Sequence, residues 1–160
     1  MIVINGSARS ENNTAKLVRH LLGEKVEIIE LCEQHVSHYN YDGRYSDNDN
    51  FQEIVDRMIV SEIIVLATPV YWYTMSGHMK AFLDRWTDLV TTHKSKGRAL
   101  KGKKIAVIAQ STSEAMPEGF EIPFRLTAEY MDMEYVGGVF WDMRKTLEEI
   151  NELKKALSWL

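Results

Sequence analysis

The sequence predicts an α/β fold in three layers, in which helices cover both faces of a five-stranded parallel sheet. The first observation behind this prediction is that short apolar segments alternate along the chain with segments whose apolar residues recur at helical spacing, as in repeated βαβ units. The second is the length of 160 residues, which suits one domain. Right-handed crossovers leave few topologies, and the doubly wound strand order 2-1-3-4-5 fits best.

The expected strands are short apolar runs, most of them rich in β-branched residues, as is typical of strands buried on both faces. They are MIVIN (1–5), KVEIIEL (25–31), EIIVLA (62–67), IAVIAQ (105–110) and EYVGGVF (134–140).

A helix is expected after each strand. The apolar stripes that predict the helices start at Leu17, Phe51 and Met79, cover about 120–131, and start again at Leu147. Asn50 with Glu53, and Thr146 with Glu149, resemble capping boxes at two helix starts. The polar, tyrosine-rich stretch 32–50 and the basic stretch 94–104 are expected to be exposed loops.

Composition excludes several classes of protein. The net charge of −4 gives no electrostatic basis for binding nucleic acid or an anionic membrane. The single cysteine, Cys32, allows no internal disulfide and no multi-cysteine metal or iron–sulfur site within one chain. The N-terminal run is too short for a signal peptide and lacks a basic flank, and no apolar run approaches the ~20 residues of a membrane span. We therefore expect a cytoplasmic protein that forms a single domain over residues 1–160.

The loop GSARSENNT (6–14) is longer than a strand-to-helix turn requires. It lies at the predicted carboxyl edge of the sheet and leads into a helix, whose N-terminus suits a phosphate. The loop adds hydroxyl, amide and guanidinium donors. It lacks both the Gly-Lys-Ser/Thr of a nucleotide P-loop and the GxGxxG dinucleotide fingerprint. A polar connector that only caps the helix is the alternative, and this loop alone does not decide between them.

A second long loop, TPVYWYTMSG (68–77), follows the third strand on the other side of the predicted switch point. Tyr71, Trp72 and Tyr73 are consecutive, so they cannot all face the core, while Pro69 and Gly77 shape the turn. A flat aromatic ligand stacked here, with its phosphate in the first loop, would use both loops. An interface patch is the alternative.

The stretches SARSENNT and TPVYWYTMSGHMKAFLDRW, with the expected strand order, resemble the NAD(P)H-dependent FMN reductases of the flavodoxin-like superfamily, which includes iron–sulfur flavoproteins and quinone reductases. The resemblance covers essentially the whole chain and implies a flavodoxin-like FMN-binding domain. It implies that the FMN phosphate is bound by Ser7, Arg9, Ser10, Asn13, Thr14 and Ala15. The ribityl chain and isoalloxazine would contact Pro69, Val70, Tyr71, Trp72 and Tyr73, and the other ring edge Ser111, Thr112 and Ser113.

Two departures from the family pattern matter. The third loop, QSTSEAMPEG, lacks the glycines often found there in the family, which puts its ring contacts in doubt. The segment after the second strand has one cysteine where the iron–sulfur branch has a compact cluster, so no cluster is expected.

The activity implied by the resemblance is transfer of hydride from NADPH or NADH through bound FMN to a small acceptor, such as a quinone, free flavin, or azo or nitro compound. The flavin carries the chemistry, so no catalytic side chain and no metal are assigned. FAD is not expected, because a short switch-point cleft would leave no second groove for an adenosine half. The resemblance also implies a homodimer or a dimer of dimers, with 73–86 as an apolar face.

Two alternatives from other classes remain. One is a flavodoxin-type electron carrier without a nicotinamide site, against which the mild acidity argues. The other is a non-enzymatic sensor or assembly module.

Some polar residues have plainer interpretations. His35 and His38 lie near Cys32, but no further ligand follows at metal-binding spacing, so they are expected in an exposed loop. Asp84 and Arg85 are expected to form a surface or helix-cap pair, with a role at an interface as the alternative.

Overall fold

The centre of the molecule is a six-stranded sheet. The structure is a computed structural model and describes residues 1–10, 12–155 and 157. The main path is β2-β1-β3-β5-β6, which confirms the predicted order of the parallel strands. Their bounds are Ile2–Asn5 for β1, Glu27–Glu30 for β2, Ile63–Tyr71 for β3, Lys104–Ser111 for β5 and Glu134–Asp142 for β6. The prediction of five strands missed β4 (Thr74–Met75), which pairs antiparallel with the end of β3.

Alternate residues of each strand face opposite layers of the molecule. Ile2, Ile4 and Ile64 belong to one apolar core, together with Phe51 and Phe82. Val3 and Val65 belong to a second core on the other face of the sheet, which also contains Leu17 and Ile150. The sheet is therefore buried on both sides, as a doubly wound fold requires.

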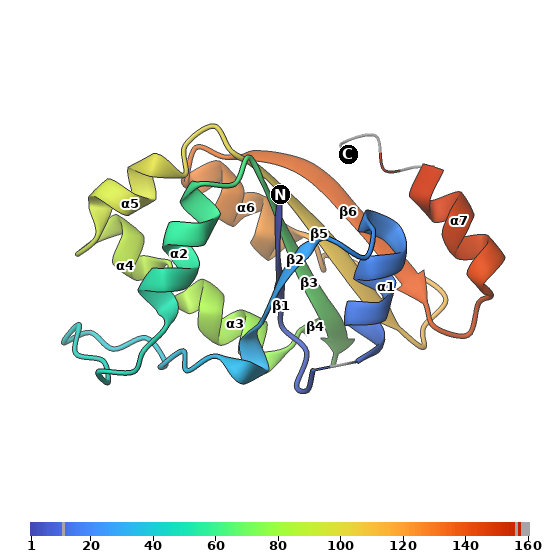
Figure 1. Ribbon diagram of the computed structural model, residues 1–160, viewed down its shortest axis with the longest axis horizontal. Helices are drawn as coiled ribbons and strands as arrows, with labels where there is room; N and C mark the ends of the chain where they lie inside the picture. The colour runs from blue at the N-terminus through green and yellow to red at the C-terminus, as the bar shows by residue number, and fades with distance from the viewer. Residues whose placement is uncertain (11, 156, 158–160) are drawn as a thin grey trace.

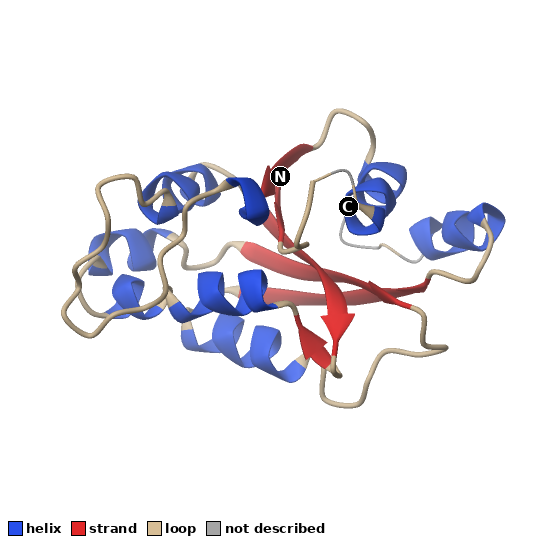
Figure 2. Cartoon of the chain, turned by 90° about the horizontal axis from the view of Figure 1, so that it is seen from below, coloured by secondary structure: helices blue, strands red, loops and turns tan. Residues whose placement is uncertain are grey.

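The helices divide unequally between the two faces (Figures 1 and 2). The side that α1 (Asn13–Leu22) covers is completed by α7 (Leu147–Lys155). The opposite side has α2 (Phe51–Ile59), α3 (Gly77–Asp84), α4 (Thr87–Val90), α5 (Lys94–Ala99) and α6 (Ile122–Tyr130). A 3₁₀ turn, η1 (Leu31–Glu33), follows β2.

Two sequence predictions about helices were wrong. The stripe from Met79 to Leu89 is two helices, α3 and α4, and the basic stretch 94–104 contains α5. Helices α4 and α5 approach so closely that a Cβ at Gly97 would lie 2.1 Å from the Leu89 carbonyl oxygen, so glycine is required there. The basic segment is therefore packed against α4 through Gly97.

Of the two predicted capping boxes, one has a capping contact. The Glu149 carboxylate accepts a 2.8 Å hydrogen bond from the Thr146 backbone N–H. Asn50 makes no side-chain cap bond to α2, and its Oδ1 instead accepts the His35 N–H at 3.0 Å. Asn50 therefore anchors the preceding loop.

Over the part of the chain that the structure describes, no helix has both the length and the apolar character needed to span a membrane.

Candidate functional site

The loops after β1, β3 and β5 meet because their strands are neighbours in register. Asn5 pairs with Ala67, and Pro69 pairs with Gln110. The Gly6 N–H donates to the Ala67 carbonyl at 2.8 Å. The first two loops, distant in sequence, therefore lie together at the switch point.

A cleft of about 470 Å³ opens between these loops. The residues that line it are Ser7, Ala8, Arg9, Asn12, Asn13, Pro69, Val70, Tyr71, Gln110, Ser111, Thr112 and Met143. The structure thus brings together eight of the site residues expected from the sequence: Ser7, Arg9, Asn13, Pro69, Val70, Tyr71, Ser111 and Thr112. Thr14 and Ala15 are buried outside this lining, and Ser10, Trp72, Tyr73 and Ser113 are exposed outside it.

Two hydroxyls and an amide form a buried hydrogen-bonded group at one end of the cleft. Ser7 Oγ donates to Thr14 Oγ1 at 3.0 Å, and Gln110 Nε2 donates to the same oxygen at 3.0 Å. Each hydroxyl has one proton. The Ser7–Thr14 bond uses the Ser7 proton, so the Thr14 proton remains to be donated to a ligand.

The start of α1 borders the same end of the cleft. The Asn12 side chain accepts from the Ala15 N–H at 2.8 Å and donates to the Arg9 carbonyl, which fixes the bend of the loop. The N–H groups of Asn13 and Thr14, in the first turn, have no acceptor within the helix. Helix N–H groups, hydroxyls and the Arg9 guanidinium therefore surround one end of the cleft, which favours an anionic oxygen group there.

Glycine is required at the start of the first loop. A Cβ at Gly6 would lie 2.7 Å from the Met79 Cβ and 3.0 Å from Ser76 Oγ. Ser76 caps α3, because its Oγ accepts from the Met79 N–H at 3.2 Å, and it also donates to the Gly6 carbonyl. The close approach locks the first loop against the start of α3.

Gln110 is a cleft residue that sequence reasoning missed. Its side chain is only 7% exposed, and its Oε1 has no hydrogen-bond partner among the described residues. A buried amide oxygen without a partner is costly, so it points to an acceptor site for a ligand hydroxyl or N–H. The available signal was a polar residue that ends the apolar run IAVIAQ.

The three consecutive aromatic residues lie at the tip of the β3–β4 hairpin. Tyr71, Trp72 and Tyr73 are 51%, 91% and 75% exposed, which confirms that they do not face the core. Tyr71 lines the cleft. Trp72 and Tyr73, rather than the expected Gly77, adopt the unusual backbone, with φ of 48° and 70°. Positive φ is unfavourable for bulky residues, so the hairpin contacts must hold this tip in place.

A second series of hydrogen bonds, made by Asn5 and Glu30, supports the first loop. Asn5 is fully buried; its side-chain oxygen accepts the Ser7 N–H at 3.2 Å, and its Nδ2 donates to Glu30 at 2.8 Å. Burial raises the pKa of Glu30, and the bond from Asn5 offsets only part of this effect. Glu30 at the end of β2 is thereby linked through Asn5 to the cleft residue Ser7.

The loop after β6 closes another side of the cleft. The Met143 N–H donates to the Ser111 carbonyl at 2.8 Å, and Met143 lines the cleft. Hydrogen bonds from the Arg144 guanidinium and N–H to Asp142 lower the pKa of that carboxyl to about 2. Asp142 is therefore ionised at neutral pH, and the pair fixes the turn that carries Met143.

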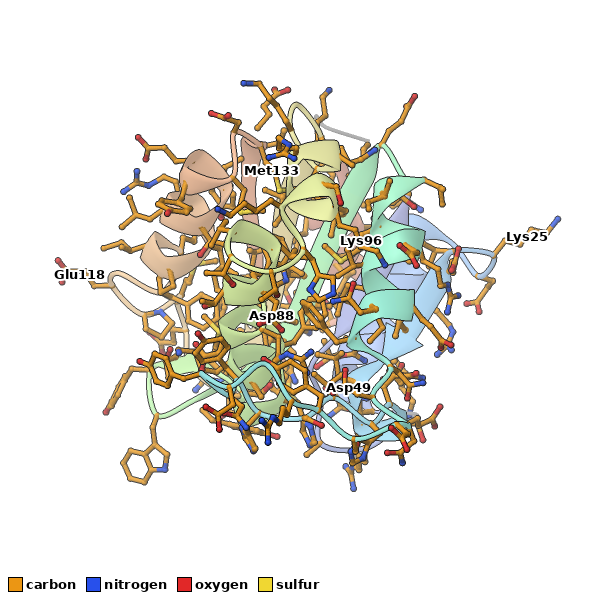
Figure 3. The ribbon with its side chains drawn as sticks, turned by 90° about the vertical axis from the view of Figure 1, so that its left-hand side faces the viewer. Lys25, Asp49, Asp88, Lys96, Glu118 and Met133 are labelled. Carbon is orange, nitrogen blue, oxygen red and sulfur yellow. The ribbon has the colours of Figure 1, made fainter. Side chains whose placement is uncertain are left out.

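The prediction for Asp84 and Arg85 was wrong, because Asp84 pairs with Lys80 and Arg85 is buried with 1% of its side chain exposed. The Arg85 guanidinium donates to Asp49 at 2.7 Å and to Asp88 at 2.9 Å. It lies over the Tyr45 ring, 3.4 Å from the centroid. Figure 3 labels Asp49, from the loop before α2, and Asp88, from α4. Arg85 thus ties the 32–50 segment to the body of the protein.

A hollow of about 600 Å³ adjoins the cleft at Asn13 and Met143, between α1, β6 and α7. Its other lining residues include Lys16, Arg19 and Lys145. The expectation that no second groove would lie near the phosphate end was therefore wrong.

A doubly wound parallel sheet with a cleft at its switch point defines a flavodoxin-like α/β protein. The chain belongs to the NADPH-dependent FMN reductase family, whose model matches residues 1–146. This confirms the family expected from the sequence.

Individual relatives match less of the chain. It is 33% identical over 91 residues to the putative NAD(P)H-dependent FMN-containing oxidoreductase YwqN of Bacillus subtilis, a match that covers 53% of this chain and 50% of YwqN. The chain therefore spans about half the length of the curated relatives it matches.

Solved structures agree in fold. A Trp repressor binding protein from Bacillus subtilis is similar with a TM-score of 0.76 and 24% identity, over 98% of this chain and 97% of that one. An FMN-dependent NADH-azoreductase from Bacillus anthracis, in complex with FMN, has a TM-score of 0.67 and 13% identity, over 99% and 97% of the two chains. At these identities the likeness shows the flavodoxin-like fold alone.

Proposed function

We propose that the protein is an FMN-dependent NAD(P)H oxidoreductase that acts on a small acceptor, such as a quinone, a flavin or an azo compound. Family membership supports this activity, as do the relative described as an NAD(P)H-dependent FMN-containing oxidoreductase and the relative described as an FMN-dependent NADPH-azoreductase. The observation that carries the proposal is the cleft, which has anion-binding donors at one end and an aromatic wall at the other.

The residues of the cleft fit FMN. Its phosphate would be held by the Ser7–Thr14 hydroxyl pair, the first turn of α1 and Arg9. Gln110 Oε1, buried and without a partner among the described residues, would accept a ribityl hydroxyl or a ring N–H. Val70 and Tyr71 offer apolar and aromatic surface to the ring. Bound FMN supplies hydride transfer between a nicotinamide and an acceptor, and the chain supplies binding and orientation.

The distribution of aromatic residues favours a reductase over an electron carrier. A carrier buries both faces of its flavin, whereas a reductase must leave one face open to a nicotinamide and then to the acceptor. Among the described residues that line the cleft, Tyr71 is the single aromatic one, and the opposing Ser111 and Thr112 are small. One ring face can therefore stay accessible, unless a second subunit covers it.

The test is anaerobic stopped flow on the FMN-loaded protein without a partner protein. NADPH or NADH should bleach the flavin absorbance, and a quinone should restore it, with parallel lines in a double-reciprocal plot. If millimolar nicotinamide leaves the flavin oxidised, while dithionite produces a stable one-electron-reduced form, the protein is an electron carrier instead.

We also propose that the protein is a homodimer or tetramer. An apolar groove lies between α3–α4 and α6, lined by Leu83, Trp86, Val90 and Leu126 among others, and the neighbouring Tyr130 is 76% exposed. Leu83 and Trp86 belong to the 73–86 segment that was expected at an interface. An exposed apolar face of this kind suits a contact between subunits. Sedimentation at micromolar concentration should give at least a dimer, and a monomer would contradict the proposal.

Two further expectations complete the proposed function: that residues 1–160 form one domain, and that the protein is cytoplasmic. A single cooperative unfolding transition would support the first. Cell fractionation tests the second, which the proposed use of NAD(P)H favours.

A further inference from the structure

A separate pocket of about 400 Å³ lies against the proposed flavin cleft. Ala8 and Tyr71 line both hollows, so the wall that they form is shared. The rest of the pocket comes from the segment after β2, with His35 and His38, and from the start of α3, with His78. Three of the five histidines of the chain therefore converge on one pocket beside the cleft.

The charged groups around this pocket favour an anion. The titratable side chains that line it are the three histidines and Tyr71; neither a carboxylate nor a lysine or arginine is among them. Glu33 on η1 and Lys80 on α3 belong to the same elements but do not line it. An imidazole ring can donate a hydrogen bond to an anionic oxygen through a ring N–H. Gln34 adds a neutral amide.

A metal ion does not explain the cluster, because among the described residues no group of three or more His, Cys, Asp or Glu side chains is placed to hold one. Burial in an apolar core does not explain it either, since His35, His38 and His78 are all exposed. The three imidazoles are therefore accessible to a ligand from solution.

The segment that carries two of these histidines is held in place although it lacks regular structure. The His35 N–H donates to Asn50 Oδ1 at 3.0 Å. Between the two histidines, the Ser37 N–H donates to Asp49 at 2.8 Å, and its carbonyl accepts from Arg85 at 3.1 Å. Because Asp49 and Arg85 form a buried ion pair, the backbone around both histidines is fixed before a ligand arrives, which reduces the entropic cost of binding.

We propose that this pocket binds an anionic group, namely a phosphate, sulfonate or carboxylate, of the molecule whose reacting ring occupies the neighbouring cleft. The inference rests on the proposed function, because it assigns the pocket to a substrate of the same site. Two sources offer this chemistry: the phosphates of the nicotinamide dinucleotide, or an acidic substituent on the acceptor. In both cases the anionic group would lie beside Ala8 and Tyr71, the residues that the pocket and the cleft share.

The first experiment is independent of turnover. Inorganic pyrophosphate is titrated at about pH 6, with excess FMN present, while the imidazole resonances are followed by NMR and assigned through single His→Gln variants. Signals from His35, His38 and His78 should shift saturably, whereas that of His93, which lines neither this pocket nor the hollow at Lys16, should not. If none of the three pocket signals shifts, or if the His93 signal shifts with them, the proposal is overturned.

The second experiment identifies the source of the anionic group. NADP⁺, which does not reduce the flavin, is titrated by calorimetry into the FMN-loaded wild type, His38→Gln, His78→Gln and the control His93→Gln. The KM values for 1,4-naphthoquinone and for its 2-sulfonate are measured on the same proteins. A loss of about tenfold for NADP⁺ in both pocket variants assigns the dinucleotide phosphates. A similar loss for the sulfonate, but not for the neutral quinone, assigns the acceptor.

The results that would refute anion binding in this pocket differ from those that would refute the proposed oxidoreductase function. Unchanged NADP⁺ and sulfonate values, or equal losses for charged and neutral quinones, would refute the pocket assignment, even if FMN uptake and flavin reduction are normal. If the wild type takes up no FMN, the proposed function fails, and the pyrophosphate titration still decides whether the pocket binds anions.

Discussion

Replacing Thr14 by valine tests the proposed phosphate site most directly. The Thr14 side chain is fully buried, and its hydroxyl accepts two bonds of 3.0 Å, from Ser7 Oγ and Gln110 Nε2. Valine keeps a similar volume but removes the Thr14 proton, and it leaves Gln110 Nε2 without its acceptor. A hydrogen bond to a charged group contributes about 1.5–3 kcal/mol, so FMN affinity should fall about 10- to 150-fold. Riboflavin, which has no phosphate, should lose less affinity than FMN, because only the effect on the Gln110 bond applies to it.

The assay is a titration of the flavin-free protein, followed by quenching of flavin fluorescence, with FMN and riboflavin in parallel. Thr91→Val is a matched control, because the Thr91 hydroxyl is exposed and only donates to the Thr87 carbonyl. Equal losses for FMN and riboflavin would refute the reasoning, since the hydroxyl would then maintain the shape of the loop rather than contact the phosphate.

Four more predictions follow from the same geometry. Gln110→Leu should weaken FMN and riboflavin alike, in the same fluorescence titration, because the amide oxygen faces a part that both share. FMN should be taken up near 1:1 and FAD should not, because the chain belongs to a family of FMN reductases; chromatography of the released flavin checks this, and FAD bound with its adenosine half in the hollow at Lys16 would contradict it. Arg85→Met should cost about 3–5 kcal/mol in urea unfolding, because it leaves Asp49 and Asp88 buried without their cation. Burial raises the pKa of Glu30, so its protonated form is favoured in the fold, and stability should decline as pH rises from about 4.3 through the folded pKa. Glu30→Gln should remove that decline, and an unchanged pH profile of unfolding would count against the assignment.

The sheet was predictable because its central strands β1, β3 and β5 are mainly apolar runs, each with its own local signal. In a fold buried on both faces, β1 and β3 need no information beyond their apolar character and the handedness of the crossovers. The first two loops were predictable for the same reason, since once the order is known, the ends of β1 and β3 must meet. The short β4 was missed because two residues carry no periodic signal.

Gln110 and Arg85 could not be assigned, because their environments depend on contacts between distant segments. The partner of Gln110 is 96 residues away in the chain, and Asp49 lies 36 residues from Arg85. A charged residue near the end of an amphipathic helix is exposed in most proteins, so local reasoning placed Arg85 at the surface. Its burial depends on the path of the irregular 32–50 segment, for which the sequence shows no periodicity.

The 32–50 segment therefore has a role that its composition conceals. It is polar and largely without helix or strand, which predicts an exposed loop. Yet the Arg85 guanidinium contacts it at three points: the Ser37 carbonyl, the Asp49 carboxylate and the Tyr45 ring. Burial raises the pKa of Asp49, but hydrogen bonds from Arg85 and Ser37 outweigh this effect and lower the pKa, so the carboxylate stays charged. The buried Arg85 guanidinium thus orders the segment that brings His35 and His38 beside the cleft. The path of the backbone at these histidines is set by an ion pair rather than by a helix or strand.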